Sequence, residues 1–321
     1  MFNYIIALGV FLMAFLCVAV LRKTETLDVP NQRSSHETPT PSGGGLGFVS
    51  VICMALSLYH IFFTYDFYGV IYALLIGIFM MIGFMDDRIQ LSAKFRFSIH
   101  ILLVAIYFFF LAPFFPYFEP FVPEWVINSV LFFGLLWFIN LYNFMDGIDG
   151  ITSLQTLWIL LGLGLLSPID PTLLIIYASA IIGFSYWNLP PAKIFMGDSG
   201  SISLGFIAGT LLIENAQYSL ESFFVSLILP LYYIMDASIT LVKRLLKGHK
   251  PWEAHREHFY QQRATSDKKT HKTVLIMISI CNACLLMWAY LVPILNFYAL
   301  IGAFVTVLIC LKKLKRNSKS I

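Results

Sequence analysis

The sequence predicts an all-α polytopic membrane protein with about eleven transmembrane helices, and three observations support this. Of the 321 residues, 59% are hydrophobic and only 12% are charged, whereas a soluble domain has about 25% charged residues. The mean hydropathy of the chain is +0.79. Apolar runs also recur along the whole chain, at lengths near the roughly 20 residues that cross a hydrocarbon core of about 30 Å. We therefore expect one integral-membrane domain over residues 1–321.

Each apolar run is bounded by polar residues, proline or glycine, and each is interpreted as one helix. The runs fall at 2–21, 44–63, 68–85, 95–112, 124–142, 151–166, 171–187, 201–214, 220–242, 273–292 and 294–311. The first run has no basic segment before it and is followed by Arg22 and Lys23. This predicts a retained helix with its N-terminus outside the cell rather than a cleaved signal. The last two runs, separated at Pro293, also fit a re-entrant pair.

The distribution of positive charge supports this topology. With the N-terminus outside, the inner connections are 22–43, 86–94, 143–150, 188–200 and 243–272, followed by the basic tail 312–321. All 21 Lys and Arg residues fall in or beside these segments, while the opposite connections hold only acids such as Asp66 and Glu221. Positive charge collects on the cytoplasmic side of membrane proteins, so the C-terminus is expected in the cytoplasm. The largest loop, 243–272, is too short to fold alone.

The five cysteines all lie inside apolar runs, so no disulfide framework is expected. Cys281 and Cys284 have the spacing of a redox or metal motif, but they lie in the middle of a run without a nearby histidine or carboxylate. We interpret both as packing residues.

Five aspartates mark the inner connections, which converge on one membrane face. They are Asp86, Asp87, Asp146, Asp149 and Asp198. Several negative charges at a low-dielectric boundary repel one another strongly, so either their pKa values rise or a cation lies among them. Magnesium is the natural cation, because it binds one or two carboxylates together with water and phosphate oxygens. The alternative is that each aspartate caps a helix or stabilises a turn.

Two further segments point to phosphate. The run Gly43-Gly44-Gly45 at the start of the second helix permits a close backbone approach to a phosphate, although glycine runs also serve as connectors. The 243–272 loop contains nine basic residues and four of the histidines. It is expected to bind anionic lipid headgroups or to clamp substrate phosphates. His255, Arg256 and His258 are the residues of this loop that suit a clamp, because a guanidinium binds a diphosphate in a bidentate way.

Three polar residues lie within or close to the apolar runs. Asp236 lies inside 220–242, where an acid is either functional or a hydrogen-bonded packing residue, and the sequence leaves both open. Asn140 and Asn143 close the fifth helix and could bind a substrate or ligate a metal.

The ordered motifs resemble the polyprenyl-phosphate N-acetylhexosamine-1-phosphate transferases, glycosyltransferase family 4, over almost the whole chain. Asp86-Asp87 followed by Lys94 resembles the paired-aspartate motif of that superfamily. Residues 140–150 resemble its Asn-x-x-Asn-x-x-Asp-Gly-x-Asp-Gly segment, and residues 188–198, with Pro190-Pro191-Ala192-Lys193, resemble its nucleotide and metal loop.

The resemblance implies a role for each site residue. Asp198 would ligate Mg²⁺, or Mn²⁺ in its place, with Asn143 or Asp146 nearby. Phe195 would stack on uracil, while Asn188 and Asp149 would hold the nucleoside. Asp86 and Asp87 would act on the lipid phosphate or the metal, and Lys94 would contact phosphate. Arg256 and His258 would contact the diphosphate or the sugar. Asn140, His255 and Gly44 complete the expected substrate-binding set.

The resemblance also implies the reaction. A UDP-sugar and undecaprenyl phosphate would react at the cytoplasmic face of a bacterial inner membrane, and UMP would leave. No nucleic-acid partner is expected, and a homodimer is open. The enzymes of the MraY type carry three successive histidines where this chain has His255-Arg256-Glu257-His258. That difference favours a subgroup like WbpL, which initiates O-antigen or a related surface glycan from an N-acetylhexosamine or acetamido-dideoxyhexose donor, over a muramoyl-pentapeptide substrate.

Two other classes of membrane protein fit the sequence less well. A transporter would place ionisable groups near the bilayer midplane and often shows inverted repeats, but here the motifs collect at one surface and no repeat is seen. A membrane-bound glycan acetyltransferase would need a histidine or serine base and no cluster of carboxylates, so dependence on magnesium would separate it from a phosphosugar transferase.

Overall fold

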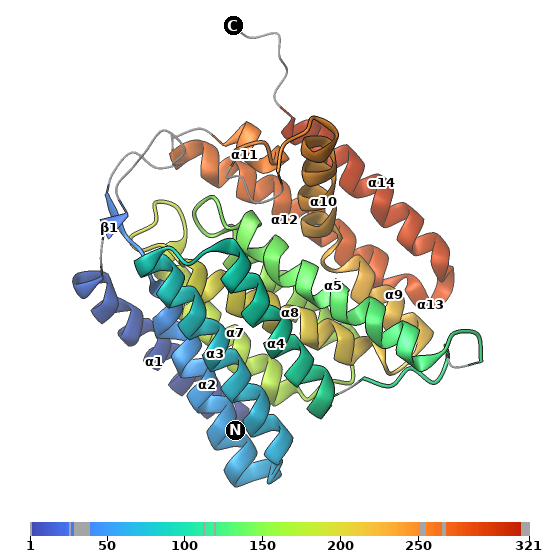
Figure 1. The fold of residues 1–321 in the computed structure, drawn as a ribbon, viewed down its shortest axis with the longest axis horizontal. Coiled ribbons are helices and arrows are strands. Elements are labelled where there is room, and N and C mark those ends of the chain that lie inside the picture. Colours follow the sequence, from blue (N-terminus) through green and yellow to red (C-terminus); the bar gives the residue numbers. More distant parts are fainter. Residues whose placement is uncertain are drawn as a thin grey trace, which may run out of the picture.

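The chain folds as one bundle of helices in the computed structural model (Figure 1). The structure describes residues 2–25, 27–28, 39–111, 113–118, 120–250, 255–264 and 268–315. Parts of the predicted inner segments, namely 26, 29–38, 251–254, 265–267 and 316–321, lie outside the described residues.

The eleven predicted runs are each helical over most of their length. The first half of the bundle consists of α1 (Phe2–Thr24), α2 (Gly44–Tyr59) with the π-helix η1 (His60–Thr64), α3 (Phe67–Ile89), α4 (Ala93–Leu111) and α5 (Glu124–Met145). The middle consists of α6 (Ile151–Leu166), α7 (Pro171–Asn188) and α8 (Asp198–Ala216). The last part consists of α9 (Leu220–Ile228), α10 (Leu231–Leu246), α11 (Phe259–Arg263), α12 (Lys268–Tyr290), α13 (Val292–Leu295) and α14 (Phe297–Leu314).

The number of membrane spans is supported only in its coarse form. Within the described residues, seven helices are long and apolar enough to cross a membrane, and the bent pair α9 and α10 would make eight. The helix α6 is apolar but shorter. An all-α, multi-pass membrane protein is confirmed, whereas the count of eleven spans stays a prediction.

Nearly every residue of α8 is buried, because this helix runs through the middle of the bundle between α3 and α5. Its small residues explain the close packing. A Cβ atom added to Gly205 would lie 2.9 Å from Tyr142 Cβ and 3.0 Å from Ile139 Cα of α5. Small residues allow helix backbones to approach closely in membranes, where the hydrophobic effect contributes little to helix association. The central position of α8 fixes where its first residue, Asp198, lies.

The prediction of one helix over 220–242 is wrong. The structure has two helices, α9 and α10, which meet at 59°. Pro230 lies at the break. A proline has no N–H for the helical hydrogen bond, and its ring clashes with the carbonyl four residues earlier, so the helix kinks there.

Two very short strands close the end of the bundle at which α8 begins. β1 (Leu27–Asp28) pairs antiparallel with β2 (Thr40–Pro41), with Leu27 opposite Pro41 and Asp28 opposite Thr40. Just after β2, Ser42 forms a bridge to Phe195 in the loop before α8. These pairings tie the first inner connection to the loop that leads into Asp198.

Candidate active site

One arginine joins two of the predicted aspartates. The helix α3 ends at Ile89, later than predicted, so that Asp86 and Asp87 lie in its last turn rather than in a loop. The guanidinium of Arg96, in the first turns of α4, contacts the carboxylate of Asp86 and lies 3.2 Å from Oδ2 of Asp198. Three helices therefore meet at one charged cluster, and its arginine was given no role by the sequence analysis.

The second oxygen of Asp198 is also bound. Asn143 Nδ2, near the end of α5, donates to Asp198 Oδ1 at 2.7 Å and to Ser201 Oγ at 3.1 Å. The predicted proximity of Asn143 and Asp198 is therefore present. Asn140 lies one turn earlier and donates to the carbonyl of Leu136 in its own helix at 2.7 Å, so its amide donor is used away from the cluster.

Asp87 caps the N-terminus of α8. Its Oδ1 accepts from the backbone N–H of Asp198 at 3.0 Å, and its Oδ2 accepts from that of Ser199 at 3.5 Å. A carboxylate at this position satisfies free N–H groups and meets the positive end of the helix dipole. Gly197 has φ 72°, and a Cβ there would lie 2.5 Å from Asp87 Oδ2. Glycine at this position lets the Asp87 carboxylate approach the backbone before α8 closely.

Asp146 directly follows α5, and the negative charges of neighbouring aspartates act on its carboxyl group. Burial, together with the negative charges of Asp87 and Asp149, raises the pKa of Asp146 to about 7, although the Thr152 side chain opposes the shift. The carboxyl of Asp146 therefore titrates near neutral pH.

Asp149 and Asn188 connect two of the predicted loops. Asp149 Oδ2 accepts from the Ala192 N–H at 2.9 Å, and its Oδ1 lies 3.4 Å from His271 Nδ1 of α12. Asn188 Oδ1 accepts from the Gly150 N–H at 3.1 Å, and its Nδ2 donates to the Ile194 carbonyl at 3.1 Å. Both side chains thus hold the 188–197 loop against the start of α6. His271 was not assigned to the site from the sequence.

Backbone hydrogen bonds join the loop around Phe195 to the segment that contains the glycine run. The N–H of Phe195 donates to the Pro41 carbonyl at 2.8 Å, and its carbonyl accepts from the Gly44 N–H at 2.9 Å. Gly45 donates in the same way to Met196 at 2.8 Å. The close backbone approach expected of these glycines is therefore to the protein's own chain, and these two N–H groups are already used. The ring of Phe195 is partly exposed.

The loop 255–264 reaches the site through Asp236. The Asp236 carboxylate has no exposed surface. It accepts from the N–H groups of Phe259 and Tyr260 at 3.0 and 3.3 Å, and His258 Nδ1 lies 3.3 Å from it. Of the two readings left open for Asp236, the structure supports a hydrogen-bonded anchor. Tyr260 OH in turn donates to the Phe144 carbonyl at 3.4 Å, which places this loop beside the end of α5.

The remaining predicted residues are Lys94, His255 and Arg256, and the structure shows none of them in contact with the Arg96 cluster within its described residues. Lys94 is exposed, and within the described part of the chain its ammonium makes no ion pair. His255 and His258 have ring centroids 4.9 Å apart, and Arg256 lies between them in sequence, partly buried. Burial, the neighbouring His258 and Arg244 together lower the pKa of His255 to about 4, so its ring is neutral at pH 7.

Comparison with known proteins identifies the class. The model of glycosyl transferase family 4 matches residues 68–216. The chain is 30% identical over 264 residues to the undecaprenyl-phosphate alpha-N-acetylglucosaminyl 1-phosphate transferase of Thermotoga maritima, covering 80% of this chain and 79% of the relative. It is 32% identical over 239 residues to the phospho-N-acetylmuramoyl-pentapeptide-transferase of Staphylococcus haemolyticus, covering 66% of this chain and 72% of the relative.

A bundle of apolar helices with this charged cluster, together with these relatives, defines a multi-pass membrane phosphoglycosyltransferase. The chain belongs to glycosyl transferase family 4. The superfamily expected from the motifs is thereby confirmed, whereas the subgroup like WbpL stays a prediction.

Proposed function

We propose that this protein transfers a sugar-1-phosphate from a UDP-sugar to undecaprenyl phosphate and releases UMP. Relatives whose names specify undecaprenyl phosphate as acceptor support the lipid substrate. The observation that carries the proposal is the cluster in which Arg96 contacts both Asp86 and Asp198, while Asp87 caps the helix that begins with Asp198. Opposed charges of this kind can position a diphosphate, which supports the proposal.

In the proposed reaction, an oxygen of the lipid phosphate attacks the β-phosphorus of the donor. The new bond joins that oxygen to the β-phosphorus, the bond from the β-phosphorus to the bridging oxygen breaks, and UMP leaves with that oxygen. Phosphoryl transfer depends on positioning and charge neutralisation more than on covalent catalysis. The lipid phosphate is ionised near neutral pH, so no general base is required. Arg96 bridges the carboxylates of Asp86 and Asp198 and offsets part of their charge. Lys94 and Arg256 are the cations proposed to meet the phosphates.

We propose Mg²⁺, or Mn²⁺ in its place, as the cofactor, held by Asp198 with Asn143. The fit rests on the donors: both are oxygen donors of the kind Mg²⁺ prefers, and the cluster has more carboxylates than the single Arg96 neutralises. No three His, Cys, Asp or Glu side chains in the described residues are grouped to hold a metal, so water and substrate phosphates would supply the other ligands. When bound, the ion would neutralise charge on the diphosphate.

For the donor, we propose that Phe195 stacks on the uracil and that the 188–197 loop, held by Asp149 and Asn188, forms the nucleoside side of the site. His258 supports a role at the diphosphate or sugar. Its Nδ1 faces Asp236, and its buried Nε2 has no hydrogen-bond partner in the described residues. A buried polar atom without a partner calls for one, and a substrate oxygen would supply it.

We further propose eleven spans, an N-terminus outside, and an active site on the cytoplasmic face of a bacterial inner membrane. The concentration of all 21 Lys and Arg residues in or beside the predicted inner segments supports this orientation. The lysines outside the site would bind anionic lipid headgroups.

Donor identity separates two versions of the proposal. An N-acetylhexosamine or acetamido-dideoxyhexose donor would start an O-antigen or related surface glycan, and the relatives named for N-acetylglucosamine support it. A muramoyl-pentapeptide donor is the alternative, favoured by the relative from Staphylococcus haemolyticus but opposed by the absence of three successive histidines at 255–260.

The test is UMP release by purified protein with undecaprenyl phosphate, Mg²⁺ and a panel of UDP-sugars, including UDP-N-acetylglucosamine. We expect release that requires lipid and metal, and that falls by about 100-fold or more in Asp198→Asn. The matched control is Asp170→Asn, because Asp170 caps the far end of α7 through Thr172 N–H at 2.8 Å. Absence of release with every donor, from folded protein in active lipid, would overturn the proposal.

A further inference from the structure

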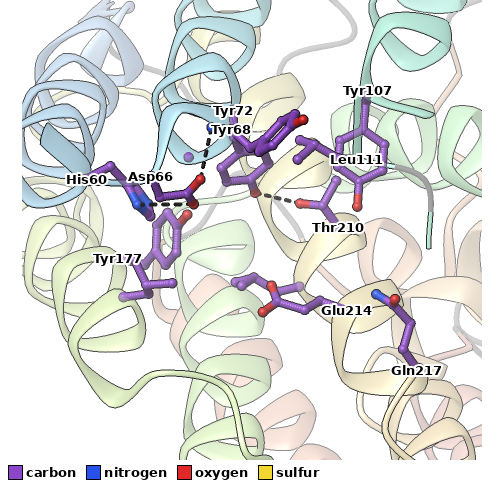
Figure 2. Close-up of a pocket in the computed structure, with 13 residues that line it drawn as sticks. His60, Asp66, Tyr68, Tyr72, Tyr107, Leu111, Tyr177, Thr210, Glu214 and Gln217 are labelled. Atoms are coloured by element: carbon purple, nitrogen blue, oxygen red, sulfur yellow. Dashed lines mark hydrogen bonds and ion pairs between the residues drawn. The ribbon is translucent and has the colours of Figure 1, made fainter. Parts of the chain in front are cut away.

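A separate cavity lies at the other end of α3 and α8 (Figure 2). Its volume is about 250 Å³, far more than the roughly 10–15 Å³ that a single water needs on this measure, so it has room for a small organic molecule. Tyr72, near the start of α3, and Glu214, near the end of α8, belong to its lining. Asp87 and Asp198 lie about 15 residues away along the same helices, or about 23 Å at 1.5 Å per residue. The cavity is therefore distinct from the acid cluster.

Tyrosine is the most frequent residue type in the described lining. Tyr72, Tyr107 and Tyr177 come from three different helices and line the cavity. Tyr107 and Tyr177 are 6% and 1% exposed, so packing fixes their rings. The hydroxyl of Tyr72 is hydrogen-bonded to Thr210 Oγ1 at 2.5 Å. The wall thus combines rigid aromatic surface with a few polar atoms, as small-molecule sites commonly do.

The charge of the lining is negative. Figure 2 shows the Glu214 carboxylate in the middle of the lining, between Tyr177 and Gln217. Among the described residues this carboxylate has no hydrogen bond or ion pair. The other acid, Asp66, is already engaged, because its Oδ1 accepts from the Tyr68 N–H at 3.0 Å and its Oδ2 lies 3.6 Å from His60 Nδ1. No Lys or Arg is found among the described lining residues.

The acidic lining, without a lysine or arginine among its described residues, favours a positively charged ligand over an anion. An anion would face an unpaired carboxylate without any compensating lysine or arginine. A partly buried carboxylate, conversely, is stabilised by a cation brought next to it. Tyrosine rings add to this preference, since the face of an aromatic ring attracts an ammonium group.

We propose that this cavity binds an organic ammonium group, with Glu214 as its counter-ion and the rings of Tyr72, Tyr107 and Tyr177 around it. Gln217 Oε1 accepts from the Phe114 N–H at 3.1 Å and keeps room for one further hydrogen bond, from a hydroxyl or N–H of the same ligand. The group comes either from a free amine or from the ethanolamine headgroup of a phospholipid, and in the proposed orientation it approaches from outside the cytoplasm.

Binding is measured on the purified full-length protein in a neutral detergent, by the thermal unfolding midpoint during titration with choline or ethanolamine. We expect a saturable rise in the midpoint with either amine, and none with equal concentrations of sodium chloride or glycerol. In Glu214→Gln we expect the apparent Kd to rise by about tenfold or more, because the counter-ion is lost. Tyr107→Leu is a second variant and should also weaken binding. Glu221→Gln, an exposed glutamate at the start of α9, is the matched control and should bind as the unchanged protein does.

Bilayer nanodiscs separate the two sources. If the headgroup is the ligand, discs with phosphatidylethanolamine stabilise the unchanged protein relative to discs with phosphatidylglycerol alone, and Glu214→Gln removes the difference. If a free amine is the ligand, choline or ethanolamine stabilises the protein in both kinds of disc. An equal shift with sodium chloride would overturn the proposal in favour of an inorganic cation or a salt effect. A shift with glycerol that survives Glu214→Gln, or no shift with any probe, would also overturn it. UMP release is assayed separately, so a failure here does not bear on the transferase.

Discussion

His258 Nδ1 lies 3.3 Å from Oδ1 of Asp236, and both side chains are buried, at 2% and 0% exposure. The same oxygen accepts the backbone N–H of Phe259 at 3.0 Å. An acid within α10 therefore holds a loop 22 residues further along the chain and sets the orientation of the histidine ring. Because the ring is fixed through Nδ1, the other nitrogen is the one directed away from Asp236.

The first prediction concerns this anchor. In Asp236→Asn the amide NH₂ replaces one carboxylate oxygen and faces a backbone N–H that now donates a hydrogen bond to that oxygen. The N–H is left buried without an acceptor, which costs about 1–3 kcal/mol. We expect the amides of Phe259 and Tyr260 to exchange with deuterium about tenfold faster or more, and UMP release to fall with them. Asp170→Asn is the control for the chemical change. Unaltered exchange at Phe259 and Tyr260 would show that Asp236 does not hold the loop.

The second prediction concerns Arg96. Its removal in Arg96→Ala leaves the carboxylates of Asp86 and Asp198 without their shared cation, and an uncompensated buried charge is costly. We expect UMP release to fall by about tenfold or more, with a higher magnesium concentration unable to restore it fully. Arg88→Ala is matched, because Arg88 lies at the same end of α3 and pairs with Glu25 instead. Equal activity of the two variants would contradict a specific role for Arg96.

The third prediction is a pH dependence. The pKa of Asp146 is raised to about 7, first by burial and then by its acidic neighbours, so the carboxyl is neutral below about pH 7 and ionised above it. A negative Asp146 strengthens binding of a divalent cation nearby. We therefore expect the magnesium concentration for half-maximal activity to fall as the pH rises from 6 to 8, and Asp146→Asn to flatten this dependence. A profile with the same slope in the variant would assign the titration to another group.

The fourth prediction tests the proposal that no general base is needed. At saturating magnesium, where the titration of Asp146 no longer limits the rate, Asp86→Asn and Asp87→Asn should each lower the rate of UMP release without moving its pH profile, because the attacking lipid phosphate is already ionised. A pH–rate profile measured for each variant over the same range decides this. A displaced profile in one of them would identify that aspartate as a base.

Helices and motifs could be predicted from the sequence because apolar length and the order of polar residues are local properties. The break at Pro230 was also readable, since proline interrupts a helix wherever it lies inside one. Arg96 carried a weaker signal: a charge at the margin of an apolar run is a functional candidate, but only the packing of α4 against α3 and α8 reveals its two partners. The cap of Asp87 on α8 depends on a contact between residues 111 positions apart, which no local pattern contains.

The last prediction tests how closely α3 must approach the start of α8. A Cβ on Gly83 would lie 2.5 Å from the N atom of Ser199 and would meet the Asp198 backbone as well, so Gly83→Ala must push these helices apart. Overpacking of this kind costs about 1–3 kcal/mol, and a displacement of about 1 Å at a reacting centre can lower a rate by about 100-fold. Gly77→Ala is the matched control in the same helix, because its Cβ would lie 3.7 Å from Cys53 Sγ, an ordinary contact. Comparing thermal midpoint and UMP release for both variants decides the matter. We expect Gly83→Ala to lower both the thermal midpoint and UMP release. Gly77→Ala should lower neither, since alanine is the better helix former. Equal behaviour of the two variants would mean that the contact between α3 and Asp198 is looser than in the structure.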